Sequence, residues 1–190
     1  MSIQANDVLD AKGLACPMPI VKTKKAIKEL DPGQVMEVQA TDKGSTADLK
    51  AWAESTGHQY LGTVEEDDIL KHYVRKASVA EAKEEKKYEK IAELSTLQAK
   101  YKEGATITVL DVREPAEFAF GHIPGAVNIP FGELVERFEE LDKKKELYII
   151  CRTGSRSDLA AQKLTEAGFT NIWNVVPGMS KWDGPLANER

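Results

Sequence analysis

The sequence predicts an α/β protein of two small domains joined by a helical linker, and three observations lead to this prediction. The chain has 190 residues, which is enough for two domains of modest size. Segments with strand and helix periodicity alternate along both halves. Between the halves, residues 78–92 contain no glycine or proline and are rich in good helix formers, so we expect a solvated helix there. The predicted domains are therefore residues 1–77 and 93–190.

The first half predicts a two-layer sandwich with the order β-α-β-α-β-β. Its strands and helices are bounded by turn residues such as Asp31-Pro32-Gly33 and by Gly57, and Ser45 is the expected cap of the second helix. In chain order the expected elements are a strand over 6–12, a helix over 17–30, a strand over 34–41, a helix over 45–55, and strands over 58–66 and 69–76.

The second half alternates strands and helices more regularly, which predicts a parallel sheet covered on both faces. The expected helices cover residues 94–104, 114–121, 132–141 and 157–168, with a last helical turn over 177–182. The expected strands cover residues 107–112, 126–130, 146–150 and 171–176.

Composition and charge exclude several classes of protein. The net charge of −5 makes the chain a poor candidate for binding nucleic acid through its overall field. No apolar run is long enough to span a membrane, and the first residues do not resemble a secretory signal. Two cysteines, Cys16 and Cys151, are too few for a disulfide scaffold or a four-cysteine zinc site. We therefore expect a cytoplasmic protein with reduced thiols.

Metal binding is not expected either. The three histidines, His58, His72 and His122, share no ligand spacing with one another or with a cysteine. We predict neither a metal site nor a bound cofactor.

The strongest chemical signal is the cysteine that follows the apolar strand over 146–150. Ligands bind at the carboxyl ends of strands in such sheets, and a tight loop at a helix N-terminus favours an anion. Cys151 should therefore have a lowered pKa and act as a thiolate nucleophile. A buried, inert core cysteine would not explain the glycine and the two arginines just beyond it. The expected anion-binding loop consists of Cys151, Arg152, Thr153, Gly154, Ser155 and Arg156.

The length of this loop separates two kinds of chemistry. Four residues lie between Cys151 and Arg156. Cysteine phosphatases close a ring that is one residue larger around a tetrahedral phosphate. The shorter loop favours a single terminal sulfur, so sulfur transfer is preferred over phosphatase or arsenate reductase chemistry.

Residues from about 93 to 186 resemble a single-domain rhodanese, which is a sulfurtransferase. The resemblance rests on DVREPAEFAFGHIPGAVNIP (111–130), CRTGSRS (151–157), AGFTNIWNVVPG (167–178) and Trp182. It implies a persulfide on Cys151, formed from a sulfane-sulfur donor such as thiosulfate. It also implies that Asp111 and Arg113 support the loop from beside it. For Glu117 and His122 we favour a structural role.

The second signal is LDAKGLACPMP, in which Cys16 lies between a strand and a helix. Proline is favoured at the first position of a helix, so Pro17 should begin the helix and Cys16 should be its N-cap. The helix dipole would then stabilise a thiolate or persulfide. Because Pro17 and Pro19 bring no N–H, we expect a sulfur carrier rather than a strong catalyst at this position.

Residues 1–76 resemble the TusA/SirA family of small sulfur carriers, and the order of the two halves resembles known fusions of this family with rhodaneses. The matching residues are Leu9-Asp10, Gly13-Leu14, Cys16-Pro17-x-Pro19 and Thr41-Asp42-x-Gly44-Ser45.

Together the two cysteines suggest a sulfur relay. Cys151 would take sulfur from thiosulfate or a persulfide donor and pass it to Cys16, which would deliver it to a thiol or a protein acceptor. A cysteine desulfurase or another sulfur carrier would be a suitable partner, and a homodimer would allow exchange between chains. Three alternatives stay open: transfer in the reverse direction, a persulfide sensor without multiple turnover, and a structural disulfide between Cys16 and Cys151.

Overall fold

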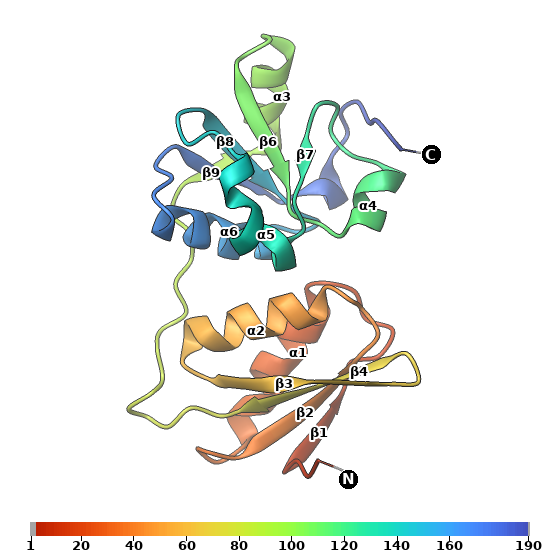
Figure 1. The fold of residues 1–190 in the computed structure, drawn as a ribbon, viewed down its shortest axis with the longest axis vertical. Coiled ribbons are helices and arrows are strands. Elements are labelled where there is room, and N and C mark those ends of the chain that lie inside the picture. The colour runs from red at the N-terminus through yellow and green to blue at the C-terminus, as the bar shows by residue number, and fades with distance from the viewer. Residues whose placement is uncertain (1–2, 190) are drawn as a thin grey trace. The chain divides into compact units, whose positions relative to one another are not determined.

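The computed structural model describes residues 3–189 and divides the chain into two compact units, one ending at Lys86 and the next beginning at Lys87 (Figure 1). The N-terminal unit has the predicted order of strands and helices. Its elements are β1 (Asp7–Asp10), α1 (Met18–Ala26) with a 3₁₀ turn (Ile27–Glu29), β2 (Val35–Ala40), α2 (Ser45–Thr56), β3 (Gln59–Glu66) and β4 (Ile69–Arg75).

The sheet of the N-terminal unit has the strand order β1-β2-β4-β3. β1 and β2 are parallel, whereas β4 pairs antiparallel with both β2 and β3. Met36 and Val38 lie on one face of β2 and are fully buried, and they share a core with the buried Leu49 and Trp52 of α2. Alternation along β2 therefore turns its apolar side chains toward the helices, and the predicted two-layer sandwich is confirmed.

The start of α2 differs from the expectation by one residue. Ser45 is the first helical residue, and Gly44 occupies the cap position. The Ser45 hydroxyl donates a hydrogen bond to the carbonyl oxygen of Asp42 at 2.5 Å and contacts the ring of His72. It therefore does not accept a hydrogen bond from the first N–H groups of the helix, as a capping hydroxyl would.

The C-terminal unit is the predicted α/β domain with a parallel sheet. Its elements are β5 (Ile91–Glu93), α3 (Leu94–Lys102), β6 (Ile107–Asp111), α4 (Pro115–Phe120), β7 (Val127–Asn128), α5 (Leu134–Arg137), β8 (Glu146–Ile150), α6 (Ser155–Glu166) and β9 (Ile172–Val176), followed by a 3₁₀ turn (Met179–Lys181). The strand order is β5-β9-β8-β6-β7, and every pairing is parallel.

Because crossovers between parallel strands are right-handed, this strand order puts the helices on both faces. The connections through α3 and α4 run toward β7, whereas those through α5 and α6 run toward β5, so the two pairs of helices cover opposite faces (Figure 1). All strands then end at one edge of the sheet.

Two elements of the C-terminal unit depart from the prediction. The short strand β5 was not expected, and it begins inside the segment assigned to the linker. The helix expected over 132–141 is broken into 3₁₀ turns on either side of the four-residue α5. Phe131 and Leu134 are buried three positions apart, which is the spacing at which 3₁₀ side chains share a face.

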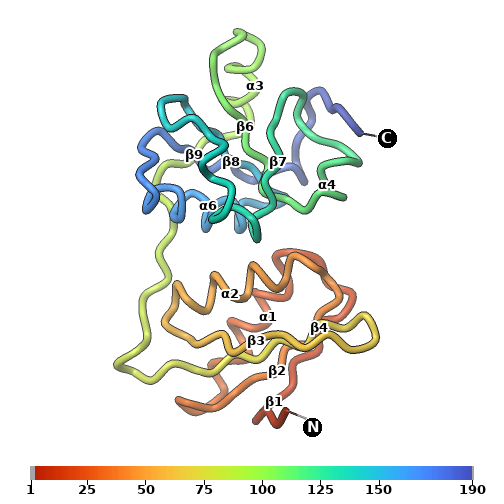
Figure 2. Tube along the Cα trace, in the orientation of Figure 1, coloured from red at the N-terminus to blue at the C-terminus, as the bar shows by residue number. Residues whose placement is uncertain are grey.

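The predicted linker helix is wrong. One turn forms at Ser78, whose N–H donates to the Glu81 carboxylate at 2.8 Å, and the chain then runs extended (Figure 2). The N–H of Lys83 donates to the carbonyl oxygen of Thr56, at the end of α2, at 3.0 Å instead of continuing a helix. Isolated helices of about 15 residues are marginal in water, so these few contacts suffice to prevent one.

Within residues 3–189, no helix has the length and apolar character needed to cross a membrane.

The extended linker passes directly over Gly57, the left-handed residue that ends α2 with φ of 82°. A Cβ at this position would collide with the backbone carbonyl of Glu81. Gly57→Ala should therefore lower the stability of the N-terminal unit by more than the roughly 1 kcal/mol that a left-handed alanine costs by itself. Urea unfolding followed by circular dichroism would measure the difference.

Gly33→Ala is the matched control for this prediction. Gly33 is also left-handed, with φ of 86°, and an added Cβ would meet nothing within 4 Å. Equal losses for the two variants would contradict the contact between the linker and Gly57.

Candidate functional site

Cys151 lies where the central strand of the C-terminal unit ends. The side chains of Leu147, Tyr148, Ile149 and Ile150 are all buried, as expected for a strand covered on both faces. The chain then makes a tight turn and enters α6, with Gly154 at the N-cap position in a left-handed conformation (φ 94°). Cys151 itself is 0% exposed. The sulfur therefore lies at the base of the loop rather than on an exposed surface.

Two polar groups lie within hydrogen-bonding distance of the sulfur. The backbone N–H of Gly154 donates to Sγ of Cys151 at 3.1 Å, and the hydroxyl of Ser157 lies 3.3 Å from the same atom. Both are close enough to stabilise negative charge on the sulfur. The N-terminus of α6 adds its dipole in the same direction.

The carbonyl groups at the start of the loop are held by the turn that follows β9. The N–H of Met179 donates to the oxygen of Cys151 at 2.8 Å, and that of Ser180 donates to the oxygen of Arg152 at 2.9 Å. Gly178 makes this approach feasible, because a Cβ there would lie 2.5 Å from the Cys151 oxygen. Since these carbonyls are occupied, the loop can turn its amide groups toward the sulfur.

Thr153 and Ser155 carry the donors that the loop leaves unused. Within residues 3–189, the buried hydroxyl of Thr153 has no hydrogen-bond partner, and no acceptor takes the backbone N–H of Thr153 or Ser155. Buried polar groups are usually paired, so unpaired donors beside a cysteine are suited to a bound anion.

The side chain of Arg156 is engaged by another helix of the same domain. Its side chain is 3% exposed and forms a two-bond ion pair with Glu117 of α4, at 2.8 and 3.1 Å. Burial alone would raise the pKa of Glu117, but the bonds and charge of Arg156 outweigh it, and the net pKa of Glu117 is lowered. Arg156 therefore joins α6 to α4, whereas Arg152 is the exposed arginine of the loop.

Asp111 and Arg113 lie beside the loop and bind each other. Asp111 ends β6, next to Ile150, and its carboxylate accepts a 2.6 Å bond from Arg113. Arg113 also donates to the carbonyl oxygen of Gly121 at 2.8 Å. Both side chains are nearly buried, so this pair fixes the segment that carries α4 and Glu117.

His122 has the structural position that we favoured. Its Nδ1 lies 2.8 Å from the carbonyl oxygen of Phe118, its ring stacks on the Phe118 ring, and its backbone pairs with Ala187. These contacts fasten the turn after α4.

Sequence reasoning missed Ser157 and Asn174. Ser157 is fully buried and contacts the sulfur, although it lies beyond the loop as we bounded it. Asn174 of β9 is 2% exposed and donates from Nδ2 to the carbonyl oxygen of Gly154 at 3.3 Å. A polar residue in the middle of an apolar strand was the available signal for Asn174.

Cys16 lies in the loop between β1 and α1, one residue before the position we expected. α1 begins at Met18, and Pro17 is its N-cap. The N–H of Cys16 donates to Oδ2 of Asp42 at 3.1 Å, and the N–H of Gly13 donates to the hydroxyl of Thr41 at 2.9 Å. The segment after β2 therefore holds the cysteine loop in place.

Cys16 is also buried, with only 3% of its surface exposed. Within residues 3–189, neither Cys16 nor Cys151 is part of a disulfide.

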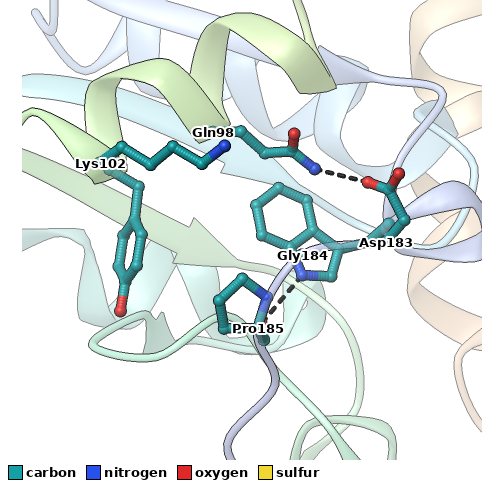
Figure 3. Close-up of a pocket in the computed structure, with 7 residues that line it drawn as sticks. Gln98, Lys102, Asp183, Gly184 and Pro185 are labelled. Atoms are coloured by element: carbon teal, nitrogen blue, oxygen red, sulfur yellow. Dashed lines mark hydrogen bonds between the residues drawn. The ribbon is translucent and has the colours of Figure 1, made fainter.

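A separate cavity of about 610 Å³ lies between α3 and residues 182–185, which follow the last 3₁₀ turn (Figure 3). Its lining includes Gln98, Lys102 and Trp182, and the amide of Gln98 donates to Asp183. None of the predicted site residues lines it.

Comparisons with known proteins match both units. The family model "Sulfurtransferase TusA" matches residues 7–76, and the "Rhodanese-like domain" model matches residues 92–184. A Bacillus subtilis protein named "Putative sulfur carrier protein YrkF" is 50% identical over 96% of this chain and 98% of its own length. The chain belongs to the family of TusA–rhodanese fusion proteins.

Further relatives match the rhodanese domain alone. The Bacillus subtilis protein named "Putative sulfurtransferase YtwF" is 44% identical over 50% of this chain and 92% of its own length. A crystal structure of a rhodanese-like domain protein from Staphylococcus aureus has a TM-score of 0.51 and 30% identity, and covers 54% of this chain and 100% of its own. The TusA and rhodanese resemblances and the fold class are thus confirmed.

The Glu117–Arg156 pair leads to a prediction about stability. Glu117→Gln would leave the buried Arg156 without its counter-charge and should cost the rhodanese domain about 1–3 kcal/mol at pH 7. The pKa of Glu117 is lowered in the folded state, so this contribution is complete above its ordinary value of 4.5 and is lost as the pH falls below it. Urea midpoints between pH 3 and 7 should therefore converge for the two proteins as the pH falls.

Glu140→Gln provides the control, because the Arg137–Glu140 pair is exposed at the surface of the same domain. Its urea midpoint should match that of the unmodified chain. An equal loss for both variants would contradict a special contribution of Glu117.

The contact between Ser157 and the sulfur predicts an effect on reactivity. In a Cys16→Ser background, Ser157→Ala should slow alkylation of Cys151 by iodoacetamide about threefold to tenfold, since one hydrogen bond to the thiolate is lost. Ser155→Ala is the matched control, because the Ser155 hydroxyl makes no bond to the sulfur among the described residues. Equal rates for all three proteins would remove Ser157 from the site.

Proposed function

We propose that this TusA–rhodanese fusion is a two-site sulfur relay in which Cys151 takes up sulfane sulfur and Cys16 carries it to an acceptor. The observation that carries the proposal is the Cys151 loop, in which the unpaired donors of Thr153 and Ser155 lie beside a sulfur already bonded by Gly154. Membership of the rhodanese and sulfur-carrier families supports it.

In the first step, the Cys151 thiolate attacks the outer sulfur of thiosulfate. A new S–S bond forms, the S–S bond of thiosulfate breaks, and sulfite leaves with the electron pair. A protein persulfide, such as that of a cysteine desulfurase or another carrier, would react in the same way and release its own thiolate. The loop donors of Thr153 and Ser155 would then stabilise the terminal sulfur on Cys151.

In the second step, the Cys16 thiolate attacks the outer sulfur of the Cys151 persulfide. Cys151 leaves as a thiolate and Cys16 becomes the persulfide, so no external oxidant or reductant is required. The Cys16 loop suits a carrier, because Pro17 and Pro19 bring no N–H and the N–H of Cys16 is taken by Asp42. The sulfur on Cys16 would therefore be held less firmly and passed on to an acceptor thiol. We expect the relay in the cytoplasm, where thiols stay reduced.

Intact mass after incubation with thiosulfate tests the relay. The unmodified chain should gain one sulfur atom on each cysteine, and Cys16→Ser should still load Cys151. Cys151→Ser should gain no sulfur, because Cys16 depends on Cys151 for its sulfur. Loading of Cys16 in Cys151→Ser at the normal rate would overturn the proposed order of transfer.

Mixing the two variants distinguishes transfer within one chain from transfer between chains. Cys16→Ser, first loaded on Cys151 and freed of thiosulfate, is mixed with Cys151→Ser, and the mass of the second variant is followed. Transfer between chains becomes faster with protein concentration, whereas transfer within the unmodified chain does not.

A persulfide sensor is the alternative function, and turnover distinguishes it from a relay. With thiosulfate as donor and cyanide as acceptor, an enzyme forms many thiocyanate molecules per chain, whereas a sensor stops at one sulfur per cysteine.

A further inference from the structure

The TusA domain contains a buried histidine that the proposed chemistry does not use. His72 lies on β4, is 0% exposed, and faces the helix side of the sheet between Val38 and Thr63, its partners on the neighbouring strands. A buried imidazole that serves only to fill space would lose its bonds to water without compensation. His72 instead has polar partners at both ring nitrogens.

The hydrogen bonds assign the position of the ring proton. The Ser45 hydroxyl lies 2.5 Å from the carbonyl oxygen of Asp42 and 2.9 Å from Nε2 of His72. Since a carbonyl can only accept, the single proton of Ser45 goes to Asp42. Ser45 must then accept from His72, and the ring carries its proton on Nε2.

The other ring nitrogen is satisfied by hydroxyl groups. Nδ1 of His72 lies 2.9 Å from the hydroxyls of both Tyr60 and Thr63, which also contact each other. One of them donates to Nδ1, which has a free lone pair in this tautomer. Burial lowers the pKa of His72 to about 4, so the ring is neutral at physiological pH.

This network leads to the carrier cysteine through Asp42. The carbonyl oxygen of Asp42 accepts from Ser45, and the Asp42 carboxylate accepts from the N–H of Cys16 at 3.1 Å and from the N–H of Gly44 at 3.2 Å. The Asp42 side chain is thus fixed by the loop on one side. On the other side its carbonyl oxygen accepts from both the hydroxyl and the backbone N–H of Ser45, and His72 binds that hydroxyl.

We propose that His72, neutral and protonated on Nε2, is a positioning residue for Cys16, acting through Ser45 and Asp42. It touches no reacting atom. It holds the hydroxyl of Ser45 in the orientation that fixes Asp42, which in turn fixes the backbone of Cys16 just before α1. This inference deepens the proposed function and rests on it for the role of Cys16 as carrier, but its structural part can be tested without any sulfur donor.

Amide hydrogen exchange at Cys16, followed by NMR on the full chain, is the first measurement. His72→Phe removes the donor while filling the site, and Ser45→Ala cuts the connection at its next member. Either variant should speed exchange of the Cys16 N–H about threefold to tenfold, the effect of one hydrogen bond. The double variant should be no faster than Ser45→Ala alone, because both changes interrupt one connection.

Rescue by a conservative variant separates positioning from a contribution to stability. The side-chain nitrogen of His72→Gln can occupy the place of Nε2, so this variant should restore slow exchange. The nitrogen of His72→Asn corresponds to Nδ1, so this variant should not. Val74→Ala serves as the control, since Val74 is equally buried on β4 but lies outside the network, and it should lower the melting temperature without selective exchange at Cys16.

Sulfur loading gives the functional readout. In chains that retain Cys151, the rate at which Cys16 gains sulfur should fall at least threefold in His72→Phe and recover in His72→Gln. Failure of Cys16 to load in the unmodified chain would contradict the proposed relay and not the positioning network. Exchange within twofold of normal in both His72→Phe and Ser45→Ala, equal behaviour of the Gln and Asn variants, or unchanged loading in His72→Phe would each overturn the role of His72.

Discussion

Parallel pairing of two strands places each cysteine of this protein. Cys16 follows β1, and Cys151 follows β8; the parallel neighbours β2 and β9 end at the same edges. The segment after each neighbour then binds the cysteine loop, through the Asp42 carboxylate in one domain and the N–H groups of Met179 and Ser180 in the other. The cysteine loop is therefore held in the same way in both sheets. In a parallel pair, the residues that follow the neighbouring strand lie beside the loop.

The two loops differ in which backbone group is engaged, and this difference suits different tasks. At Cys151 the carbonyls are bound from outside and an N–H reaches the sulfur, which favours accumulation of charge there. At Cys16 the N–H is given to a carboxylate, and two prolines follow. In the proposed relay, a first site that stabilises the transferred sulfur and a second site that holds it less firmly would set the order of transfer, since sulfur moves on only if the second site binds it no more tightly than the acceptor does.

Local pattern predicted most of the fold because nearly every strand and helix has an apolar periodicity of its own. The loop at Cys151 was also predictable, since an apolar strand runs directly into a cysteine, a glycine and two arginines. What the sequence could not show depended on partners distant in sequence. Arg156 forms an ion pair with Glu117, 39 residues earlier. The predicted linker helix does not form, and the N–H of Lys83 bonds to Thr56 instead. The hydroxyl of Ser45 contacts His72 and does not cap its helix. A single sequence does not reveal which distant group will occupy a side chain.

The conformation of the Cys151 loop depends on Gly178, because this residue has no Cβ. The hydrogen on its Cα leaves room for the carbonyl oxygens of Cys151 and Arg152, and any larger side chain would push both away. Natural variation could therefore distort the loop at a position outside it, while Cys151 and the residues that contact its sulfur stayed unchanged in sequence. A relative with such a substitution would look active to anyone who inspected only the residues around Cys151.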